Sequence, residues 1–171
     1  MFKNLYHLTN LCFDYFITND KGEQIVSDSK KMSGAEFEKI THKIICEYFN
    51  TEFHSQIGLF IGQPPKKHRF DLVSTDNDIV VECKCYTFTE SGNNPSAKIS
   101  TLNEAVFYMS FLQATTKKYL SIKKSYPICA PGSRKLHETL GEYYVRLYHH
   151  FLRDVKIIEI DTDNMTLQIL N

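Results

Sequence analysis

Apolar residues recur at helical spacing in three stretches of the chain. In the first stretch Phe37, Ile40 and Ile44 share one side of a helix. Ser33 precedes them as a good helix cap, and Glu36 stands at the capping-box position three residues later. The helices predicted from such spacing cover 34–49, 101–115 and 134–152.

Short apolar runs rich in β-branched residues indicate strands between and after these helices. Turn-forming clusters at 62–65 and 75–78 separate the first three runs, so we expect a three-stranded antiparallel meander. A helix, a strand, a helix and two strands then follow. This order is typical of an α/β fold in which helices flank a mixed central sheet. The predicted strands cover 57–61, 70–74, 79–86, 119–122, 155–160 and 167–170.

The N-terminal segment stands apart from this alternation. Residues 12–27 predict a hairpin, although 5–16 alternatively fit a short helix. The length of 171 residues suits about one domain. We therefore expect a single domain over 1–171 with an N-terminal appendage, a central core, and a C-terminal helix with strands. These three parts cover 1–32, 33–125 and 126–171.

Composition excludes several classes of protein. Hydrophobic residues make up 42% and charged residues 23% of the chain, as in ordinary globular proteins. No apolar run approaches the ~20 residues that span a bilayer, so we expect no membrane insertion. Five scattered cysteines and no visible secretory signal favour a reduced, cytoplasmic setting. A formal net charge of zero argues against nucleic-acid binding through overall positive charge, but it leaves local basic patches open.

Charged side chains interrupt the apolar strand predicted just before the second helix. Strand side chains alternate between the two faces of a sheet, so Glu82 and Lys84 face one way. Val81, Cys83 and Cys85 face the other way, which suits burial beneath a helix. The two cysteines lack the second pair of ligands that structural zinc needs, so we interpret them as core residues. The opposite face then carries a carboxylate and an ammonium group, which are costly there unless paired or bound.

A further acidic residue, Asp71, lies in the middle of the preceding predicted strand. The hairpin turn brings Asp71 and Glu82 to a similar height on neighbouring strands. Two converging carboxylates repel each other unless a cation joins them, and Mg²⁺ prefers such oxygen ligands. Lys84 beside them is suited to donate to a phosphate or to an attacking water. The alternative interpretation is a structural ion-pair network on the face of the sheet.

Asp71, ten further residues and then ECK at 82–84 resemble the PD-(D/E)XK motif of the restriction-endonuclease-like superfamily. The segment SGAEFE at 33–38 is similar to the first core helix of the Mrr-like branch of that superfamily. The resemblance covers 33–125 and implies the superfamily's αβββαβ core. The chain departs from the motif at Arg69-Phe70, where a proline can precede the aspartate.

This resemblance implies metal-assisted hydrolysis of phosphodiester bonds in DNA. Asp71 and Glu82 would hold Mg²⁺, for which Mn²⁺ can substitute, together with the backbone carbonyl of Cys83. Glu38 would hold a second ion or a bound water. Lys84 would orient the attacking water and stabilise developing negative charge. The resemblance therefore implies a Mg²⁺-dependent endonuclease with a catalytic core over 33–125.

By analogy with the fold, the expected role is restriction or phage defence. Cutting both strands of a duplex favours a homodimer, and a partner subunit of a defence system is a further expected partner. Aromatic side chains on the last predicted helix are candidates for a contact between copies, namely Tyr143, Tyr144 and Tyr148. The rival hypothesis is a non-catalytic DNA-binding or protein-interaction subunit that keeps the nuclease fold.

Basic residues near the motif are candidates for contacts with DNA phosphates. Three of them directly precede the aspartate strand, and they are Lys66, Lys67 and Arg69. The alternative for this run is a solvated loop. Lys98 is a fourth candidate, in a segment over 95–100 that we predict to be a substrate-facing loop. Glu104 is expected to be an exposed residue in the first turn of the helix that follows.

Overall fold

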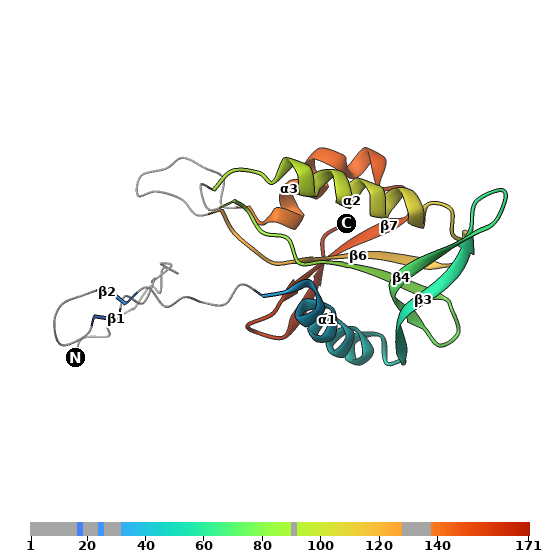
Figure 1. Cartoon of the computed structure of the whole chain (residues 1–171), viewed down its shortest axis with the longest axis horizontal. Helices are drawn as coiled ribbons and strands as arrows, with labels where there is room; N and C mark the ends of the chain where they lie inside the picture. Colours follow the sequence, from blue (N-terminus) through green and yellow to red (C-terminus); the bar gives the residue numbers. More distant parts are fainter. Residues whose placement is uncertain (1–16, 19–23, 26–31, 90–91, 128–137) are drawn as a thin grey trace, which may run out of the picture. The chain divides into compact units, whose positions relative to one another are not determined.

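The computed structural model describes residues 17–18, 24–25, 32–89, 92–127 and 138–171 (Figure 1). Contacts along the chain divide it into two units, Met1–Lys31 and Met32–Asn171. In the first unit β1 (Ile17–Thr18) pairs antiparallel with β2 (Gln24–Ile25). This pairing confirms the predicted hairpin for the described residues, whereas the helix considered over 5–16 lies outside them.

Six strands form one mixed sheet in the second unit, and their order across the sheet follows their order along the chain. The first three strands pair antiparallel with one another, the third and fourth and the fourth and fifth pair in parallel, and the last strand pairs antiparallel with the fifth. The predicted α/β class with a mixed central sheet is therefore confirmed, as is the antiparallel meander. The strands are β3 (Phe53–Ile61), β4 (Lys66–Ser74), β5 (Ile79–Lys84), β6 (Lys117–Lys123), β7 (Val155–Asp161) and β8 (Thr166–Ile169).

Helices cover both faces of this sheet (Figure 1). One face packs against α1 (Gly34–Phe49), and the other packs against α2 (Ser96–Met109) and α3 (Leu140–Tyr148). Apolar side chains fill both layers, and those fully buried include Phe37, Ile45, Leu72, Leu102, Met109, Leu120 and Ile157. A strand in the middle of the sheet, such as β7, is thus buried on both sides, which explains its nearly continuous apolar sequence. Among the described helices, none has the length and apolar character needed to cross a membrane.

Helix α1 has the predicted bounds and the predicted cap. The Glu36 backbone N–H donates to Ser33 Oγ at 3.2 Å, and the Ser33 backbone N–H donates to the Glu36 carboxylate at 2.8 Å. At the other end Asn50 adopts the left-handed conformation, with φ of 50°, and its N–H donates to the Cys46 carbonyl. Glu36 is therefore occupied in capping, which leaves Glu38, two residues further along the helix, for another role.

Helix α2 begins and ends earlier than the prediction of 101–115. It starts at Ser96, directly after Pro95, and Ile99 in its first turn is buried in the core. The loop predicted over 95–100 is therefore wrong, because Ile99 extends the apolar stripe by one turn. Glu104 is exposed as expected, but it lies in the middle of the helix rather than in the first turn.

Helix α3 is shorter than the prediction of 134–152, of which 134–137 lie outside the described residues. A capping box starts the helix: the Glu142 N–H donates to Thr139 Oγ1, and the Thr139 N–H donates to the Glu142 carboxylate. The helix ends at Tyr148 and a 3₁₀ turn follows. Tyr144 is fully buried, so its predicted part in a contact between copies is wrong, because the ring fills the core beneath α3.

The hairpin of β3 and β4 is longer than predicted and extends beyond the rest of the sheet. Each strand begins four residues earlier than the predicted 57–61 and 70–74. The prediction started too late because polar residues interrupt the apolar pattern in these first four positions. The ladder between β4 and β5 contains only Leu72 opposite Val81 and Val73 opposite Val80. We call the projecting part of the hairpin, 56–71, the arm. The basic run before Asp71 is thus part of β4 and not a loop.

Candidate active site

Asp71 lies at the fork where β4 leaves β5. The ladder ends with Leu72 opposite Val81, so the register places Asp71 opposite Glu82, one step further along. At this step the Asp71 side chain replaces the backbone contact, because its Oδ2 atom accepts a hydrogen bond from the Cys83 N–H at 2.8 Å. The fork therefore fixes one carboxylate oxygen of Asp71 against β5 and directs the other toward the arm.

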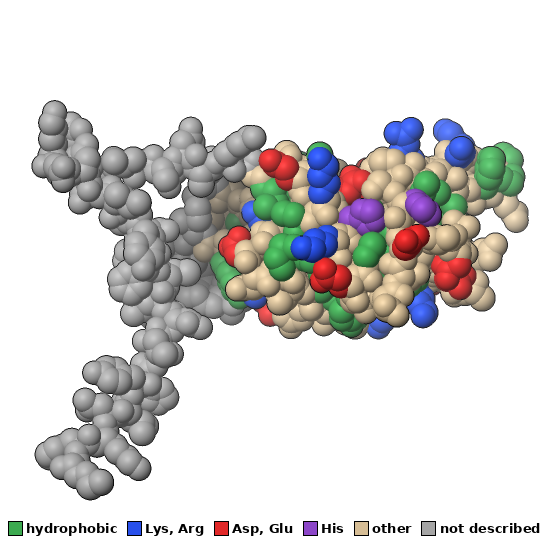
Figure 2. Space-filling view, turned by 90° about the horizontal axis from the view of Figure 1, so that it is seen from below, with side chains coloured by type: hydrophobic (Ala, Val, Ile, Leu, Met, Phe, Trp, Pro, Cys, Tyr) green, Lys and Arg blue, Asp and Glu red, His purple; other side chains and the backbone are tan. Residues whose placement is uncertain are grey.

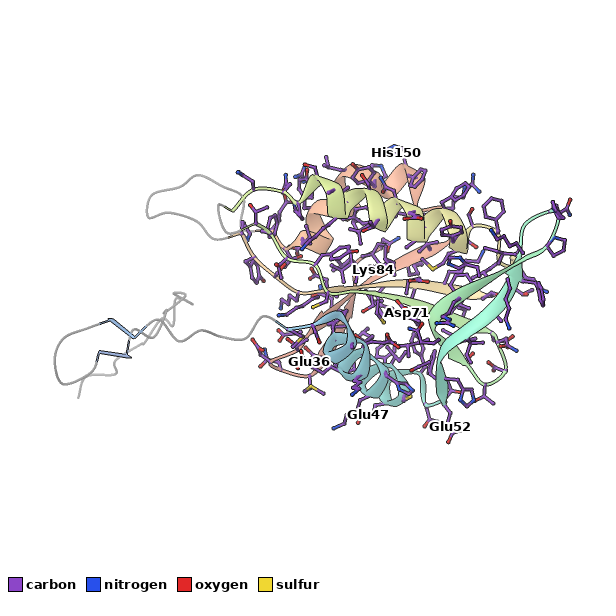
Figure 3. The ribbon with its side chains drawn as sticks, viewed as in Figure 1. Glu36, Glu47, Glu52, Asp71, Lys84 and His150 are labelled. Atoms are coloured by element: carbon purple, nitrogen blue, oxygen red, sulfur yellow. The ribbon has the colours of Figure 1, made fainter. Side chains whose placement is uncertain are left out.

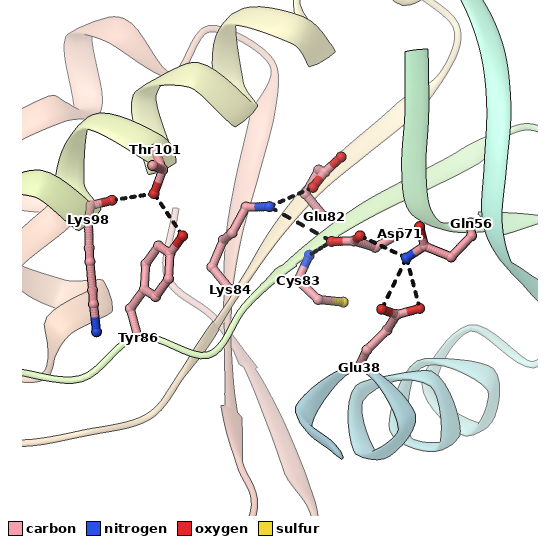
Figure 4. Close-up of polar contacts among 9 residues, drawn as sticks. All are labelled: Glu38, Gln56, Asp71, Glu82, Cys83, Lys84, Tyr86, Lys98 and Thr101. Carbon is pink, nitrogen blue, oxygen red and sulfur yellow. Dashed lines mark hydrogen bonds and ion pairs between the residues drawn. The ribbon is translucent and has the colours of Figure 1, made fainter. Parts of the chain in front are cut away.

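The side chains of β5 alternate as predicted. Val81 belongs to the core beneath α1 and Cys83 packs against that core, whereas Glu82 and Lys84 line a cavity on the side of α2. Lys84 Nζ lies 2.9 Å from Glu82 Oε2 and 3.9 Å from Asp71 Oδ2 (Figure 4). The predicted meeting of two carboxylates and one ammonium group from neighbouring strands is therefore confirmed.

Gln56, in the arm, connects a third carboxylate to this group. Its Nε2 lies 3.2 and 3.1 Å from the two carboxylate oxygens of Glu38 on α1, and 3.1 Å from Asp71 Oδ1 (Figure 4). The register of β3 with β4 places Gln56 opposite Asp71. Its φ is 59°, a left-handed conformation that costs energy for a residue other than glycine. The strained backbone thus holds the Gln56 amide between two carboxylates, at a position that a cation could also occupy.

Ionisable side chains on the outer faces of the helices, such as Glu47 and His150, lie away from this cluster. Figure 3 shows Asp71 and Lys84 close together between the helical layers, while Glu47 and His150 lie on the outer sides of those layers. Burial and charge are thus combined at the fork. The site is built from α1, β3, β4 and β5, which are held together by the sheet.

Burial and mutual charge shift the pKa values of these groups. Burial raises the pKa of Glu82 to about 7, with Asp71 adding to the rise and Lys84 opposing it. Burial alone would lower the pKa of Lys84, but the charges of Glu82 and Asp71 outweigh it and raise that pKa. Burial also raises the pKa of the Cys83 thiol, so this group remains protonated. Lys84 is therefore a permanent cation, and Glu82 titrates near neutral pH.

A cavity of about 360 Å³ opens beside these carboxylates, and we call it the site cavity. It lies between the arm, β5 and α2. Tyr86 and Thr101 form its far wall, with Thr101 Oγ1 2.8 Å from the Tyr86 hydroxyl oxygen. The residues that line it are His68, Arg69, Asp71, Glu82, Lys84, Tyr86, Thr101, Glu104, Ala105 and Tyr108.

The four predicted phosphate contacts take different positions. Arg69 is exposed and lines the site cavity. Lys98 lies behind the cavity wall, with Nζ 5.3 Å from the centroid of the Tyr86 ring, in a cation–π contact. Lys66 and Lys67 are exposed further out on the arm. On the face in Figure 2, acidic and basic side chains of the described residues are interspersed, so charge alone does not mark a binding surface there.

Sequence reasoning missed the side chains that make polar contacts around the cluster and in the far wall of the cavity, namely Gln56, Tyr86 and Thr101. Gln56 had one readable signal, because a hairpin that turns at 62–65 places it opposite Asp71. That signal requires β3 to begin before 57. The contact between Tyr86 and Thr101 depends on where α2 begins, so the sequence pattern carried no signal for it.

The donor set at the fork suits a hard divalent cation. Glu38, Asp71 and Glu82 supply three carboxylates, while Lys84 supplies the ammonium group within the cluster, and Mg²⁺ favours such oxygen ligands. In the arrangement that the structure describes, no group of three or more His, Cys, Asp or Glu side chains could hold a metal ion. Lys84 Nζ and Gln56 Nε2 stand between the carboxylates instead. A cation would therefore have to displace the Gln56 amide or shift Lys84.

Comparison of the chain with protein-family models, with curated proteins and with solved structures finds no match. The resemblance to PD-(D/E)XK nucleases thus depends on the motif and on the positions of its residues. The structural feature that supports this resemblance is the fork of β4 and β5, where Asp71 and Glu82 lie opposite each other although they are eleven positions apart in sequence.

Proposed function

We propose that the protein is a Mg²⁺-dependent endonuclease of the PD-(D/E)XK type that hydrolyses phosphodiester bonds of DNA. The observation that carries this proposal is the meeting of Asp71, Glu82 and Lys84 at the fork, beside the site cavity. Two further features support it. Glu38 reaches the cluster from α1, and the order helix, three antiparallel strands, helix and parallel strand agrees with a restriction-endonuclease-like core.

Each residue has a role that follows from its position. Asp71 and Glu82, with the backbone carbonyl of Cys83, would hold the metal, and Glu38 would hold a second ion or a bound water. The metal would supply an acidified water and charge neutralisation when it is bound. Lys84 is charged and half-buried beside the cavity, so it can donate to a phosphate oxygen and hold the attacking water. A fixed donor at this position stabilises the negative charge that develops in the transition state. Arg69 at the cavity is placed to contact a neighbouring phosphate.

The biological role we propose is restriction or phage defence. Two-strand cleavage calls for two sites, so we infer that a homodimer acts on duplex DNA, or that one copy acts with a partner subunit of a defence system. Sedimentation of the protein on a short duplex tests this point: two copies per duplex supports the homodimer, and one copy supports the partner subunit.

One observation favours a second candidate, a non-catalytic subunit that keeps the nuclease fold. Lys84 and Gln56 already contact the three carboxylates without any metal. In that case the cluster would stabilise the fold of a DNA-binding or protein-interaction module. Loss of Lys84 would then lower stability, but it would have no catalytic consequence.

Cleavage of supercoiled plasmid in Mg²⁺ or Mn²⁺ separates the two candidates. We expect the wild-type protein to cut, and Lys84→Ala to lower the rate by at least about 100-fold, the typical cost of removing one such donor. Lys124→Ala is the matched control, because Lys124 also contacts a carboxylate, that of Asp161, but outside the site. Equal cutting by the wild type and Lys84→Ala would contradict the proposal, as would no cutting by either.

A further inference from the structure

A second cavity, of about 320 Å³, lies next to the site cavity. It is formed by the turn of the arm and the C-terminal end of α2, and two residues, His68 and Tyr108, line both cavities. We call it the aromatic cavity. Its volume falls at the lower end of the range for sites that take small molecules, about 300–1,000 Å³.

Two stacked rings separate the cavities. His68 and Tyr108 lie with their ring centroids 4.0 Å apart and their planes 21° apart. The His68 ring also contacts the edge of Phe70, at a centroid distance of 4.8 Å. Burial and the charge of Lys84 lower the pKa of His68, which favours the uncharged ring. The wall is therefore flat, and the buried Phe70 of the core holds it from behind.

The rest of the aromatic cavity combines an apolar surface with positive charge. Phe111 contributes a ring that is 47% exposed, although solvent exposure of a phenylalanine is unfavourable. Ile61 and Pro64 add further apolar surface. Lys66 and Lys67 lie at the same cavity, and none of its described lining residues is acidic. Aromatic faces next to lysines are how proteins bind unpaired bases, since the base stacks and the lysines contact the backbone.

We propose that the aromatic cavity takes one unpaired nucleobase, from a nucleotide adjacent to the phosphate in the site cavity. This inference rests on the proposed nuclease function. Because the two cavities share a wall one ring pair thick, neighbouring nucleotides of one strand can occupy both. A base inside a duplex must leave the stack to enter, which costs least where the base is already unpaired. The preferred substrate is therefore a strand with an unpaired nucleotide at the cut, such as a bulge.

Binding of labelled oligonucleotides in EDTA tests this inference without cleavage. Three duplexes are compared by fluorescence anisotropy: a continuous duplex, a duplex with one bulged adenine, and the same bulge with an abasic nucleotide. We expect the bulged adenine to bind about tenfold more tightly than the abasic bulge, since stacking of one base is worth roughly that factor.

Phe111→Ala should remove this tenfold difference, because it removes the exposed ring. Tyr48→Ala is the matched control, since Tyr48 is similarly exposed, at 53%, but lies on α1. Thermal unfolding of both variants verifies that they are folded. Equal binding of the adenine and abasic bulges by the wild type would overturn the inference, as would a tenfold difference that survives in Phe111→Ala. A cavity that serves a protein partner gives the first of these results.

Plasmid cleavage distinguishes failure of this inference from failure of the proposed function. Cleavage that depends on Lys84, together with no preference for the bulged base, overturns the base pocket alone. Absence of both cleavage and oligonucleotide binding overturns the base pocket and the nuclease together. Cleavage with the expected preference supports both.

Discussion

Two buried glutamates, Glu82 on β5 and Glu159 on β7, show how one residue type serves different purposes in the same sheet. Their exposed fractions are 5% and 2%, and burial raises the pKa of both carboxyl groups. Glu159 accepts a hydrogen bond from the Gly141 N–H at 3.1 Å, at the start of α3. There it satisfies one of the N–H groups that a helix start leaves open. Glu82 instead shares Lys84 with Asp71, beside a cavity.

The difference teaches that burial alone does not identify a functional carboxylate. Glu159 is held by donors of the backbone at a helix start, where negative charge is favourable. Glu82 has a second carboxylate as a neighbour, and one ammonium group serves both. Such a cluster carries excess negative charge, which a divalent cation would balance. We therefore assign Glu159 to stability and Glu82 to chemistry, and the following variants separate these roles.

The largest difference is expected in the cleavage rate. Glu82→Gln should lower plasmid cleavage by at least about 100-fold, because it removes a charged ligand from the transition state. Glu159→Gln should leave the rate within about twofold, since an amide oxygen can still accept from Gly141. Initial rates at saturating Mg²⁺ measure both. A Glu82→Gln enzyme as active as Glu159→Gln would show that the fork has no catalytic role.

At the contact between Glu159 and Gly141 we expect a variant to change stability and to leave the metal site unchanged. A Cβ atom on Gly141 would lie 2.6 Å from Glu159 Oε1 and 2.8 Å from its Cγ, so one of them must move. We expect Gly141→Ala to lower the free energy of unfolding by about 1–3 kcal/mol, the usual cost of overpacking. Urea denaturation measures this, and Mn²⁺ affinity should stay unchanged. Unchanged stability would mean that the Glu159 contact with α3 is dispensable.

Proton competition gives the next effect, on Mn²⁺ binding. The pKa of Glu82 is about 7 in the fold and 4.5 ordinarily, so the folded state favours its neutral form. Its contribution to stability is therefore lost as pH rises from 4.5 to 7 in the absence of metal. Mn²⁺ requires the ionised form, so its affinity should rise about tenfold between pH 6 and pH 8 and then level off. Calorimetric titration of the wild type and Glu159→Gln should give the same rise. A flat profile in the wild type would exclude proton competition at Glu82.

Gln56 should have the smallest effect. Its amide must leave Glu38 and Asp71 before a cation can take its place. Gln56→Ala should therefore strengthen Mn²⁺ binding by about two- to tenfold, the worth of a hydrogen bond, while it weakens the metal-free fold. Ser55→Ala, at the neighbouring exposed position, serves as the control. Weaker Mn²⁺ binding in Gln56→Ala would instead make Gln56 a ligand.

Sequence reasoning succeeded where local patterns decide the structure. The capping box at Ser33 and Glu36 set the start of α1, and strand alternation placed Glu82 and Lys84 on one face. It failed where contacts between distant segments decide. Gln56 joins Glu38 to Asp71 through an unusual backbone conformation inside a strand, and no local pattern specifies that conformation.

The ends of elements follow the same division. Thr139 and Glu142 form a capping box that the sequence contains, yet an apolar stripe running back from Tyr144 suggested an earlier helix start. The polar arm residues form strands only because β3 and β4 pair with each other, which no apolar pattern shows. Propensity was overridden there by pairing within the hairpin.

Calorimetric titration with Mn²⁺ of the wild-type protein and of Asp71→Asn at pH 8 tests the metal site most directly. Asp71 contacts the Cys83 N–H, Lys84 and Gln56 directly. Lys84 in turn contacts Glu82, and Gln56 contacts Glu38, so Asp71 is linked to the whole cluster. We expect saturable binding to the wild type and none to Asp71→Asn. Thermal unfolding curves verify that both proteins are folded. Absence of saturable binding to the wild type, or equal binding to Asp71→Asn, would contradict a cation site at the fork.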